Sequence, residues 1–318
     1  MIHRSLGADA FALLRNFVKD FAVEPAYRSL FELALEIAQR DAEKSSIFAP
    51  VDLPATAAGL LGLPDSVAVL SAALSTLVWS GADLLDDGAD EDLCDRWAGN
   101  SPHQIALVAT NLLSTLPHTL LGRQAGFGPD AATYSQALAR TLFTMSEGQW
   151  ADLGSPATVT NLDEYMAVIR RKSGAEFALF ASTPALLAGL DQTVSTAWMG
   201  FGMAYGVMLQ AFGDALSTQR EGEGNDLLGG KRSLSVLHLL TEKSGAEHTK
   251  ICADLDLVAL GDHSGLARLR QAMVESGSLR FAKERCELLR YRAAEAFPAR
   301  LADLPMDHAA RILLRAFS

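Results

Sequence analysis

The sequence is short of basic residues, of cysteine and of aromatic side chains. Its 27 lysine and arginine residues are outnumbered by 38 aspartate and glutamate residues, which gives a formal net charge of −11. A chain without a basic surplus is poorly suited to neutralise nucleic-acid phosphates, so no nucleic-acid partner is expected. The 3 cysteines form no CxxC pair and indicate reduced thiols. The first residues, MIHRSLGADAFALLRNF, lack the pattern of a signal peptide, so we expect a cytoplasmic protein.

Strand signals are also scarce, because aromatic residues make up only 7% of the chain and no alternating pattern persists. Helical periodicity instead predicts helices over 10–41 with a break near Glu24-Pro25, and over 65–87, 103–122, 129–152, 161–190, 193–220, 233–245 and 264–318. The prolines between Pro50 and Pro54 predict an interruption. No linker divides the sequence, so residues 1–318 are expected to form one all-α domain.

One uncharged stretch, from Thr193 to Gly213, is long enough to span a bilayer. Its polar Gln210 and its glycines fit a helix buried in protein better, and the stretch ends at Asp214 without basic residues beside it. We therefore do not expect an integral membrane protein.

Acidic residues gather at the end of the apolar segment 65–87. Asp83, Asp86, Asp87 and Asp90 follow at helical spacings, where a helix carboxyl end disfavours negative charge. A solvated acidic turn explains such a run in most proteins, but carboxylates on a mostly buried helix favour a hard cation such as Mg²⁺. A second set, Asp214, Ser217 and Glu221, shares one helix face, but taken alone it is explained better by an ordinary amphipathic turn.

The order of these motifs resembles that of the trans-isoprenyl diphosphate synthases of the polyprenyl synthetase superfamily. The segment DDGAD from Asp86 to Asp90 resembles the first aspartate-rich motif, DDxxD, of that superfamily. Further segments follow in family order: GQWADL from Gly148 resembles GQxxDL, Tyr165 to Ser173 resembles Y…I…K[TS], Gln210 to Asp214 lies over the second aspartate-rich motif, and DLLGGKRSLSV from Asp226 resembles DxxxGKxTLPV.

The resemblance implies a helical bundle of the isoprenoid synthase type with a central apolar cavity, a homodimer, and Mg²⁺-dependent ionisation of an allylic prenyl diphosphate. The implied metal ligands are Asp86, Asp90, Asp214, Ser217 and Glu221. The implied catalytic residues are Asp86, Asp87, Asp90, Lys172 and Lys231. The implied substrate-binding residues are Arg96, Gln149, Lys172, Gln210 and Lys231.

The departures from the family pattern concern the acceptor. Elongating members carry GKxxRP before the first motif, whereas the region from Lys44 to Pro54 has no arginine, and the later arginine pair has become Asp95-Arg96. A second diphosphate would then be poorly neutralised, so we expect an unknown acceptor other than isopentenyl diphosphate. In this respect the chain resembles moenomycin-type and ComQ-type prenyltransferases. The alternative is that the long cationic side chain of Lys44, Arg170 or Arg171 reaches the same place from another direction.

Two other functions stay open. The spacing of Asp214, Ser217 and Glu221 resembles the metal motif of terpene cyclases, with Gly213 in place of the first ligand. The eroded motifs also fit a non-catalytic subunit of a prenyl diphosphate synthase. Gly81 and Ala82, one turn before Asp86, either leave room for a longer prenyl tail or serve helix packing.

Overall fold

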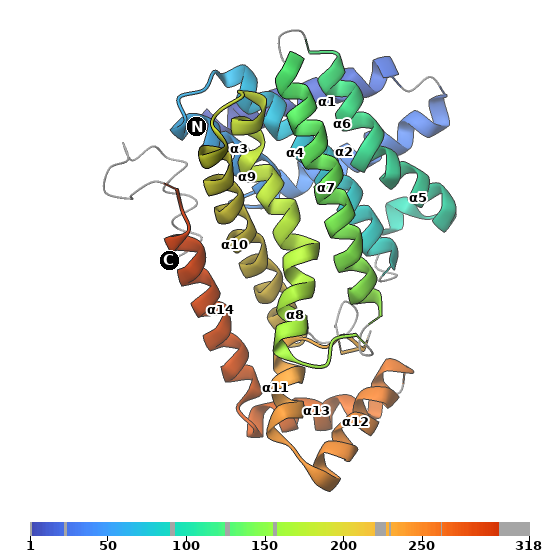
Figure 1. The fold of residues 1–318 in the computed structure, drawn as a ribbon. Coiled ribbons are helices and arrows are strands. Elements are labelled where there is room, and N and C mark those ends of the chain that lie inside the picture. The colour runs from blue at the N-terminus through green and yellow to red at the C-terminus, as the bar shows by residue number, and fades with distance from the viewer. Residues whose placement is uncertain are drawn as a thin grey trace. The chain divides into compact units, whose positions relative to one another are not determined.

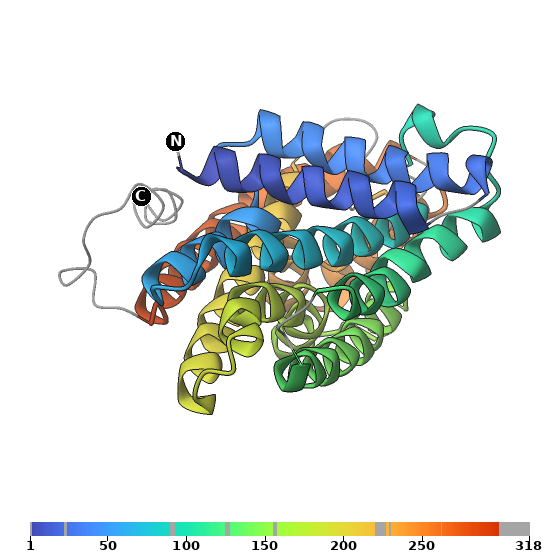
Figure 2. The ribbon, with the colours of Figure 1, turned by 90° about the horizontal axis from the view of Figure 1, so that it is seen from above.

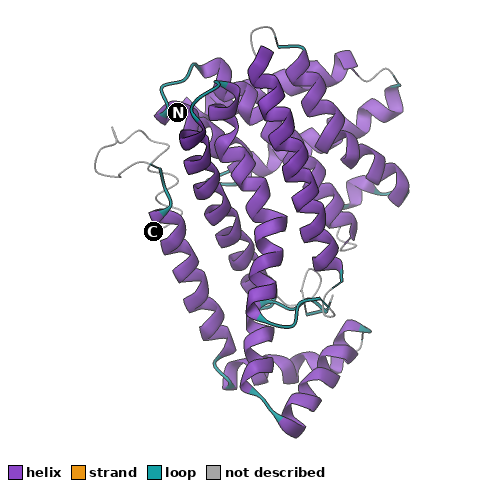
Figure 3. Cartoon of the chain, viewed as in Figure 1, coloured by secondary structure: helices purple, strands orange, loops and turns teal. Residues whose placement is uncertain are grey.

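The computed structural model describes residues 2–21, 24–89, 93–124, 128–154, 158–219, 227–228, 230–261 and 263–298. Every regular element in these ranges is a helix, as Figure 3 shows, which confirms the all-α prediction. The chain divides into two compact units, one of residues 1–142, 176–202 and 296–318 and the other of residues 143–175 and 203–295. We call them unit 1 and unit 2 and describe each by itself. The prediction of a single domain over residues 1–318 stays a prediction.

Unit 1 begins with a helical pair that is separated where the sequence predicted a break. The Glu24 carboxylate caps α2 by accepting a hydrogen bond from the Tyr27 N–H, and Pro25 occupies the first turn, where its missing N–H costs nothing. The helices of this unit are α1 (Ile2–Phe21), α2 (Pro25–Lys44), α3 (Ala49–Leu60), α4 (Asp65–Ala89), η1 (Asp95–Trp97), α5 (Pro102–Thr110), η2 (Asn111–Thr115), α6 (Leu116–Gly122), and most of α7 (Gly128–Leu153) and α9 (Ala175–Leu187).

The predicted interruption at Pro50–Pro54 is wrong, because these residues lie inside α3. Pro50 is at the start of the helix, where no N–H donor is required, and Pro54 removes a single backbone donor within it. Nearly every residue of α3 is buried, so tertiary packing offsets that lost hydrogen bond.

The helix α4 is the centre of unit 1. It packs against α1, α2, α3, α5 and η2, and Figures 1 and 2 show α1 and α2 side by side along it. Its long buried stretch, from Val67 to Leu84, explains why the acidic residues follow without an intervening loop.

Two described helical stretches, α4 and Pro102–Gly122, are long and apolar enough to cross a membrane, and the earlier candidate at Thr193–Gly213 is not among them. This is weak evidence for a membrane span, because the core helices of soluble proteins pass the same test. Of the apolar window in α4, 78% is already buried within the protein.

Unit 2 contains α8 (Leu162–Ile169), η3 (Arg170–Gly174), α11 (Leu234–Glu242), α12 (Gly245–Ala259), η4 (His263–Gly265), α13 (Leu266–Glu275) and α14 (Ser278–Glu295), together with the end of α7 and the larger part of α10 (Gln192–Ser217). An apolar cluster that includes Val236, Leu255 and Met273 joins α11, α12 and α13. The helix α12 was missing from the sequence prediction. The predicted helix over 264–318 is divided in the structure. The helix α13 ends at Glu275, and Gly277, with a positive φ of 74°, separates it from α14. Residues 299–318 lie outside the described residues.

We expect Gly81→Ala to destabilise the protein. A Cβ at this position would lie 2.7 Å from Leu113 Cγ and 2.9 Å from the carbonyl oxygen of Ala109, so Gly81 serves the close packing of α4 on the next helices. Overpacking of this kind costs about 1–3 kcal/mol, more than alanine gains in helix propensity.

The matched control is Gly200→Ala, because a Cβ at this helical position meets nothing within 4 Å. It should raise the free energy of unfolding by about 0.5–1 kcal/mol. Urea unfolding followed by circular dichroism measures both effects. Equal shifts for the two variants would contradict the packing role of Gly81.

Candidate active site

The first acidic segment lies on the last turns of α4. Asp83, Asp86 and Asp87 are all partly buried, and they follow a helix whose other residues are mostly inaccessible. Backbone carbonyls at a helix carboxyl end repel negative charge, so neither burial nor the helix itself stabilises these carboxylates. Asp90, the last residue of the predicted motif, lies outside the described residues.

The crowding of negative charge raises the pKa of Asp83. Burial, and then the negative charges of Asp87, Asp41 and Asp86, raise the pKa of Asp83 to about 7. Asp83 belongs to the acidic run in the sequence, but its raised pKa was not predicted, because the charge of Asp41 comes from α2, which lies far away in sequence.

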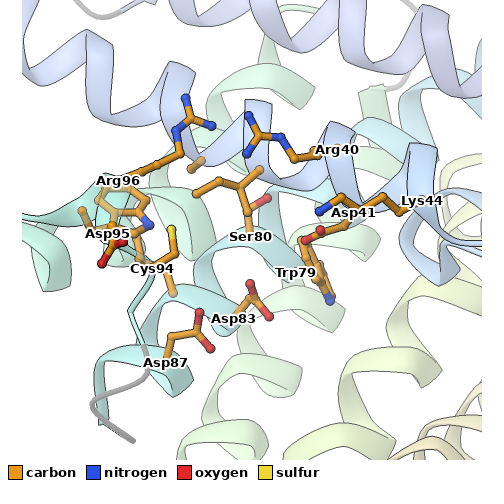
Figure 4. Close-up of a pocket in the computed structure, with 14 residues that line it drawn as sticks. Arg40, Asp41, Lys44, Trp79, Ser80, Asp83, Asp87, Cys94, Asp95 and Arg96 are labelled. Atoms are coloured by element: carbon orange, nitrogen blue, oxygen red, sulfur yellow. The ribbon is translucent and has the colours of Figure 1, made fainter. Parts of the chain in front are cut away.

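A pocket of about 530 Å³ opens beside these carboxylates, between α2, α4 and η1. Figure 4 shows its polar lining, which includes Asp41, Asp83, Asp87 and Asp95. Three cationic side chains line it too: Arg40, Lys44 and Arg96. Arg96 forms an ion pair of 2.5 Å with Glu36. Sequence reasoning considered Lys44 as an alternative cation and missed Arg40, although their spacing of four on the last turns of α2 places both on one face.

In unit 2, the second acidic segment is held by hydrogen bonds. The Tyr165 hydroxyl donates to Asp214 Oδ2 at 2.6 Å, and Gln210 Nε2 donates to Asp214 Oδ1 at 2.7 Å. The hydroxyl of Ser173 in turn donates to Gln210 Oε1 at 2.5 Å. Asp214 is therefore oriented by neighbours from α8 and α10.

The predicted diphosphate lysine Lys172 lies on the π-helical turn η3 and bonds to Asp152 Oδ2 at 2.8 Å. Gly148 explains this pairing, because a Cβ there would lie 2.8 Å from the backbone carbon of Arg171 and closer still to Lys172 N. Only glycine allows α7 to approach η3 so closely. The approach brings Asp152, one turn after Gly148, to the lysine, and π turns often occur at functional sites.

The other predicted lysine of unit 2, Lys231, follows a turn that ends at Gly230 with a φ of 71°. Lys231 lines a small cavity of about 20 Å³ together with Asp152, Tyr165, Gln210 and Asp214. Three of the predicted polar residues, Gln210, Asp214 and Lys231, therefore line one cavity.

The remaining predicted residues are less informative. Gln149 and Ser217 are partly buried on α7 and α10. Gly213, which stands at the first ligand position of the second motif, is exposed, and a Cβ there would meet open space. Glu221 lies outside the described residues.

Comparison with known proteins places the chain in a family. The polyprenyl synthetase model matches residues 97–256, which is half of the chain and includes every predicted motif after the first. This chain belongs to the polyprenyl synthetase family.

Among curated members of the polyprenyl synthetase family, a geranylgeranyl pyrophosphate synthase of Geoglobus acetivorans is 32% identical over 111 residues, or 33% of this chain and 35% of the relative. A geranylfarnesyl diphosphate synthase of Natronomonas pharaonis is 28% identical over 238 residues, or 69% of this chain and 66% of the relative. The matched segments thus span less than two thirds of these relatives.

Solved structures of polyprenyl synthetases confirm the fold class. The geranylgeranyl pyrophosphate synthetase of Pyrococcus horikoshii has a TM-score of 0.76 and 20% identity, with 100% of this chain and 98% of that chain covered. A polyprenyl synthetase of Streptomyces coelicolor has a TM-score of 0.75 and 22% identity, with 99% and 96% covered. The chain therefore has the all-α isoprenoid synthase fold, while the central apolar cavity stays a prediction.

The predicted magnesium site of this polyprenyl synthetase agrees with the chemistry of its donors. Within the described residues, no three side chains of the His, Cys, Asp and Glu types are placed to hold a metal ion together. Burial and the negative charges of Asp87, Asp41 and Asp86 nevertheless raise the pKa of Asp83, so a cation beside it would stabilise its ionised form. Carboxylate oxygens with room for water and phosphate suit Mg²⁺.

We expect the stability of this polyprenyl synthetase to depend on the protonation of Asp83. Its folded pKa of about 7 lies above the value of about 3.9 for an unfolded aspartate, so the folded state binds the proton more tightly. Asp83 therefore costs stability progressively as the pH rises from about 4 to about 7. Asp83→Asn should raise the free energy of unfolding on the order of 2 kcal/mol at pH 8 and change it little at pH 4.5.

Thermal and urea unfolding in the presence of a chelator measures this effect. Asp256→Asn, which replaces an exposed carboxylate on α12, is the control for the loss of one negative charge. A gain for Asp83→Asn that is the same at both pH values would contradict the burial of an ionised Asp83.

Proposed function

We propose that this protein is a magnesium-dependent prenyltransferase that ionises an allylic prenyl diphosphate and transfers the prenyl group to an acceptor other than isopentenyl diphosphate. The observation that carries the proposal is the accumulation of carboxylates at the end of α4, where burial and mutual repulsion raise the pKa of Asp83 to about 7. Hard divalent cations relieve such crowding and also bind diphosphates. The relatives named for geranylgeranyl and geranylfarnesyl diphosphates support this substrate class.

Each acidic and basic residue has a proposed task. Asp86 and Asp90, with Asp87 beside them, would hold Mg²⁺ at the end of α4. In unit 2, Lys172 and Lys231 would contact diphosphate oxygens, with Asp152 orienting Lys172 through their 2.8 Å hydrogen bond. Tyr165 and Gln210 would fix the direction of Asp214, the candidate ligand of the second motif with Ser217 and Glu221. Gln149 and Arg96 would add polar contacts to the substrate.

Bound Mg²⁺ would neutralise charge that develops on the leaving diphosphate. The carbon–oxygen bond of the donor breaks, and its electron pair leaves with the diphosphate. An electron pair of the acceptor forms the new bond to the allylic carbon, and the proton that the acceptor loses passes to solvent. Preorganised lysine side chains stabilise the departing oxygens, so no protein nucleophile is needed.

The structure adds cations to the pocket beside the first acidic segment, but the proposal of an acceptor other than isopentenyl diphosphate is kept. Lys44 lines the pocket, as the alternative allowed, and Arg40, which was not predicted from the sequence, lines it too. Among the described lining residues, however, the carboxyl groups of Asp41, Asp83, Asp87 and Asp95 outnumber the cations. Of the segment that replaces GKxxRP, Lys44 ends α2 and lines the pocket, whereas the residues from Ala49 onward form the buried start of α3 and bring no cation. A second diphosphate in this pocket would remain poorly neutralised.

We predict that Asp86→Ala and Asp90→Ala each weaken Mg²⁺-dependent binding of a prenyl diphosphate by at least tenfold while the helical circular dichroism spectrum is kept. The physical reason is the loss of one hard ligand, together with the relief of repulsion at the end of α4. Calorimetric titration with and without Mg²⁺ measures the change. Asp256→Ala, an exposed carboxylate on α12, is the control. Unchanged Mg²⁺-dependent affinity in both site variants would remove the metal assignment.

We also predict little chain elongation with isopentenyl diphosphate. Two diphosphates at short range repel strongly, and each missing charge-assisted hydrogen bond costs about 1.5–3 kcal/mol. The measurement is incorporation of labelled isopentenyl diphosphate onto geranyl and farnesyl diphosphates under Mg²⁺. Turnover on the order of 0.1–10 per second would make the protein an ordinary elongating synthase. Hydrocarbon products without an acceptor would indicate a terpene cyclase, and the absence of any turnover would favour a non-catalytic subunit.

A further inference from the structure

The pocket beside the first acidic segment has features that metal binding does not explain. Its wall includes the indole of Trp79, which packs edge-on against Phe48 with ring centroids 5.0 Å apart at 79°. Beside it, Ser80 is only 5% exposed, and its hydroxyl has no hydrogen-bond partner among the residues that the structure describes. A buried hydroxyl without a partner is costly, so a polar group of a ligand in this pocket would stabilise Ser80.

Two cations of the pocket are available to a ligand. Arg40 and Lys44 are exposed, line the pocket, and form no ion pair within the part of the chain that the structure describes. Because they lie four residues apart on α2, both face the same volume, as Figure 4 shows. Arg96 is already paired with Glu36 and contributes less free charge.

The carboxyl groups of the same pocket limit the charge of its occupant. Asp41, Asp83, Asp87 and Asp95 surround the volume from α2, α4 and η1. Arg40 and Lys44 attract an anion, but the four carboxyl groups oppose each further negative charge, so a monoanion meets less repulsion than a trianionic diphosphate. The volume of about 530 Å³ is large enough for a ring-sized molecule, and Trp79 offers an aromatic surface for a flat body.

We propose that this pocket binds the acceptor, and that the acceptor is a flat monoanion of the aromatic carboxylic acid class. Its carboxylate bonds to Arg40 and Lys44, its ring packs on Trp79, and a polar substituent bonds to the Ser80 hydroxyl. This inference rests on the proposed prenyl transfer, but its test does not depend on turnover.

The test is calorimetric titration of the full chain with 4-hydroxybenzoate, with its neutral amide 4-hydroxybenzamide, and with isopentenyl diphosphate. We expect the carboxylate to bind at least tenfold more tightly than the amide. Arg40→Met and Lys44→Met should each weaken carboxylate binding at least fivefold and leave amide binding unchanged, and Ser80→Ala should weaken both. Arg40→Lys keeps the charge and should retain most of the affinity. Lys283→Met, an exposed cation on α14, is the control.

Three results would overturn the inference: no binding of the carboxylate, equal binding of carboxylate and amide, or carboxylate affinity that is unchanged in both cation variants. Tighter binding of isopentenyl diphosphate that depends on Arg40 and Lys44 would also overturn it, because the pocket would then accept a polyanion. Charge-dependent carboxylate binding without prenyl transfer from any prenyl diphosphate would contradict the proposed function but would still support carboxylate binding in this pocket.

Discussion

Burial of carboxylates at the end of α4 is the constraint on which the site depends. The apolar helix carries Asp83 into a position where desolvation and the charges of Asp87, Asp41 and Asp86 all oppose ionisation. The free energy stored there is recovered when positive charge arrives, so stability and ligand binding are coupled at this point. The packing that buries α4 includes the close approach at Gly81, which fixes the helix against its neighbours. A site of this kind exchanges some stability of the free protein for affinity toward cations.

In unit 2 the packing and hydrogen bonds orient long or polar side chains. Lysine loses much rotamer freedom when it is held in one direction, and a fixed partner lowers the further loss on binding a ligand. Asp152 provides that partner for Lys172, and the glycine at position 148 makes the pairing sterically possible. The chain of hydrogen bonds from Ser173 through Gln210 to Asp214 orients the second acidic segment in the same way. Within this unit, the motif residues therefore orient one another through hydrogen bonds.

The proposed acceptor pocket of unit 1 contains both groups that attract an anion and groups that repel it. Cations from α2 attract an anion, while carboxylates from α2, α4 and η1 limit how much negative charge is tolerated. Trp79 adds an aromatic wall and the buried hydroxyl of Ser80 a polar contact. Selectivity in such a pocket arises as much from repulsion of the wrong charge as from attraction of the right one. The same balance separates a carboxylate acceptor from a diphosphate acceptor.

The sequence by itself determined the helical class, most helix positions, the order of the family motifs and the polar residues that carry them, because periodicity and motif spacing are local properties. It failed at Pro50–Pro54 and at α12, where tertiary packing overrides the local signal of proline or of weak periodicity. Only the tertiary structure decided that Arg40 and Asp41 belong beside Asp83, since α2 and α4 are separated by the whole of α3 in sequence. It also decided that Asp214 is bonded to Tyr165 and Lys172 to Asp152. Desolvation and hydrogen-bond geometry depend on which surfaces meet, and no spacing along one chain contains that information.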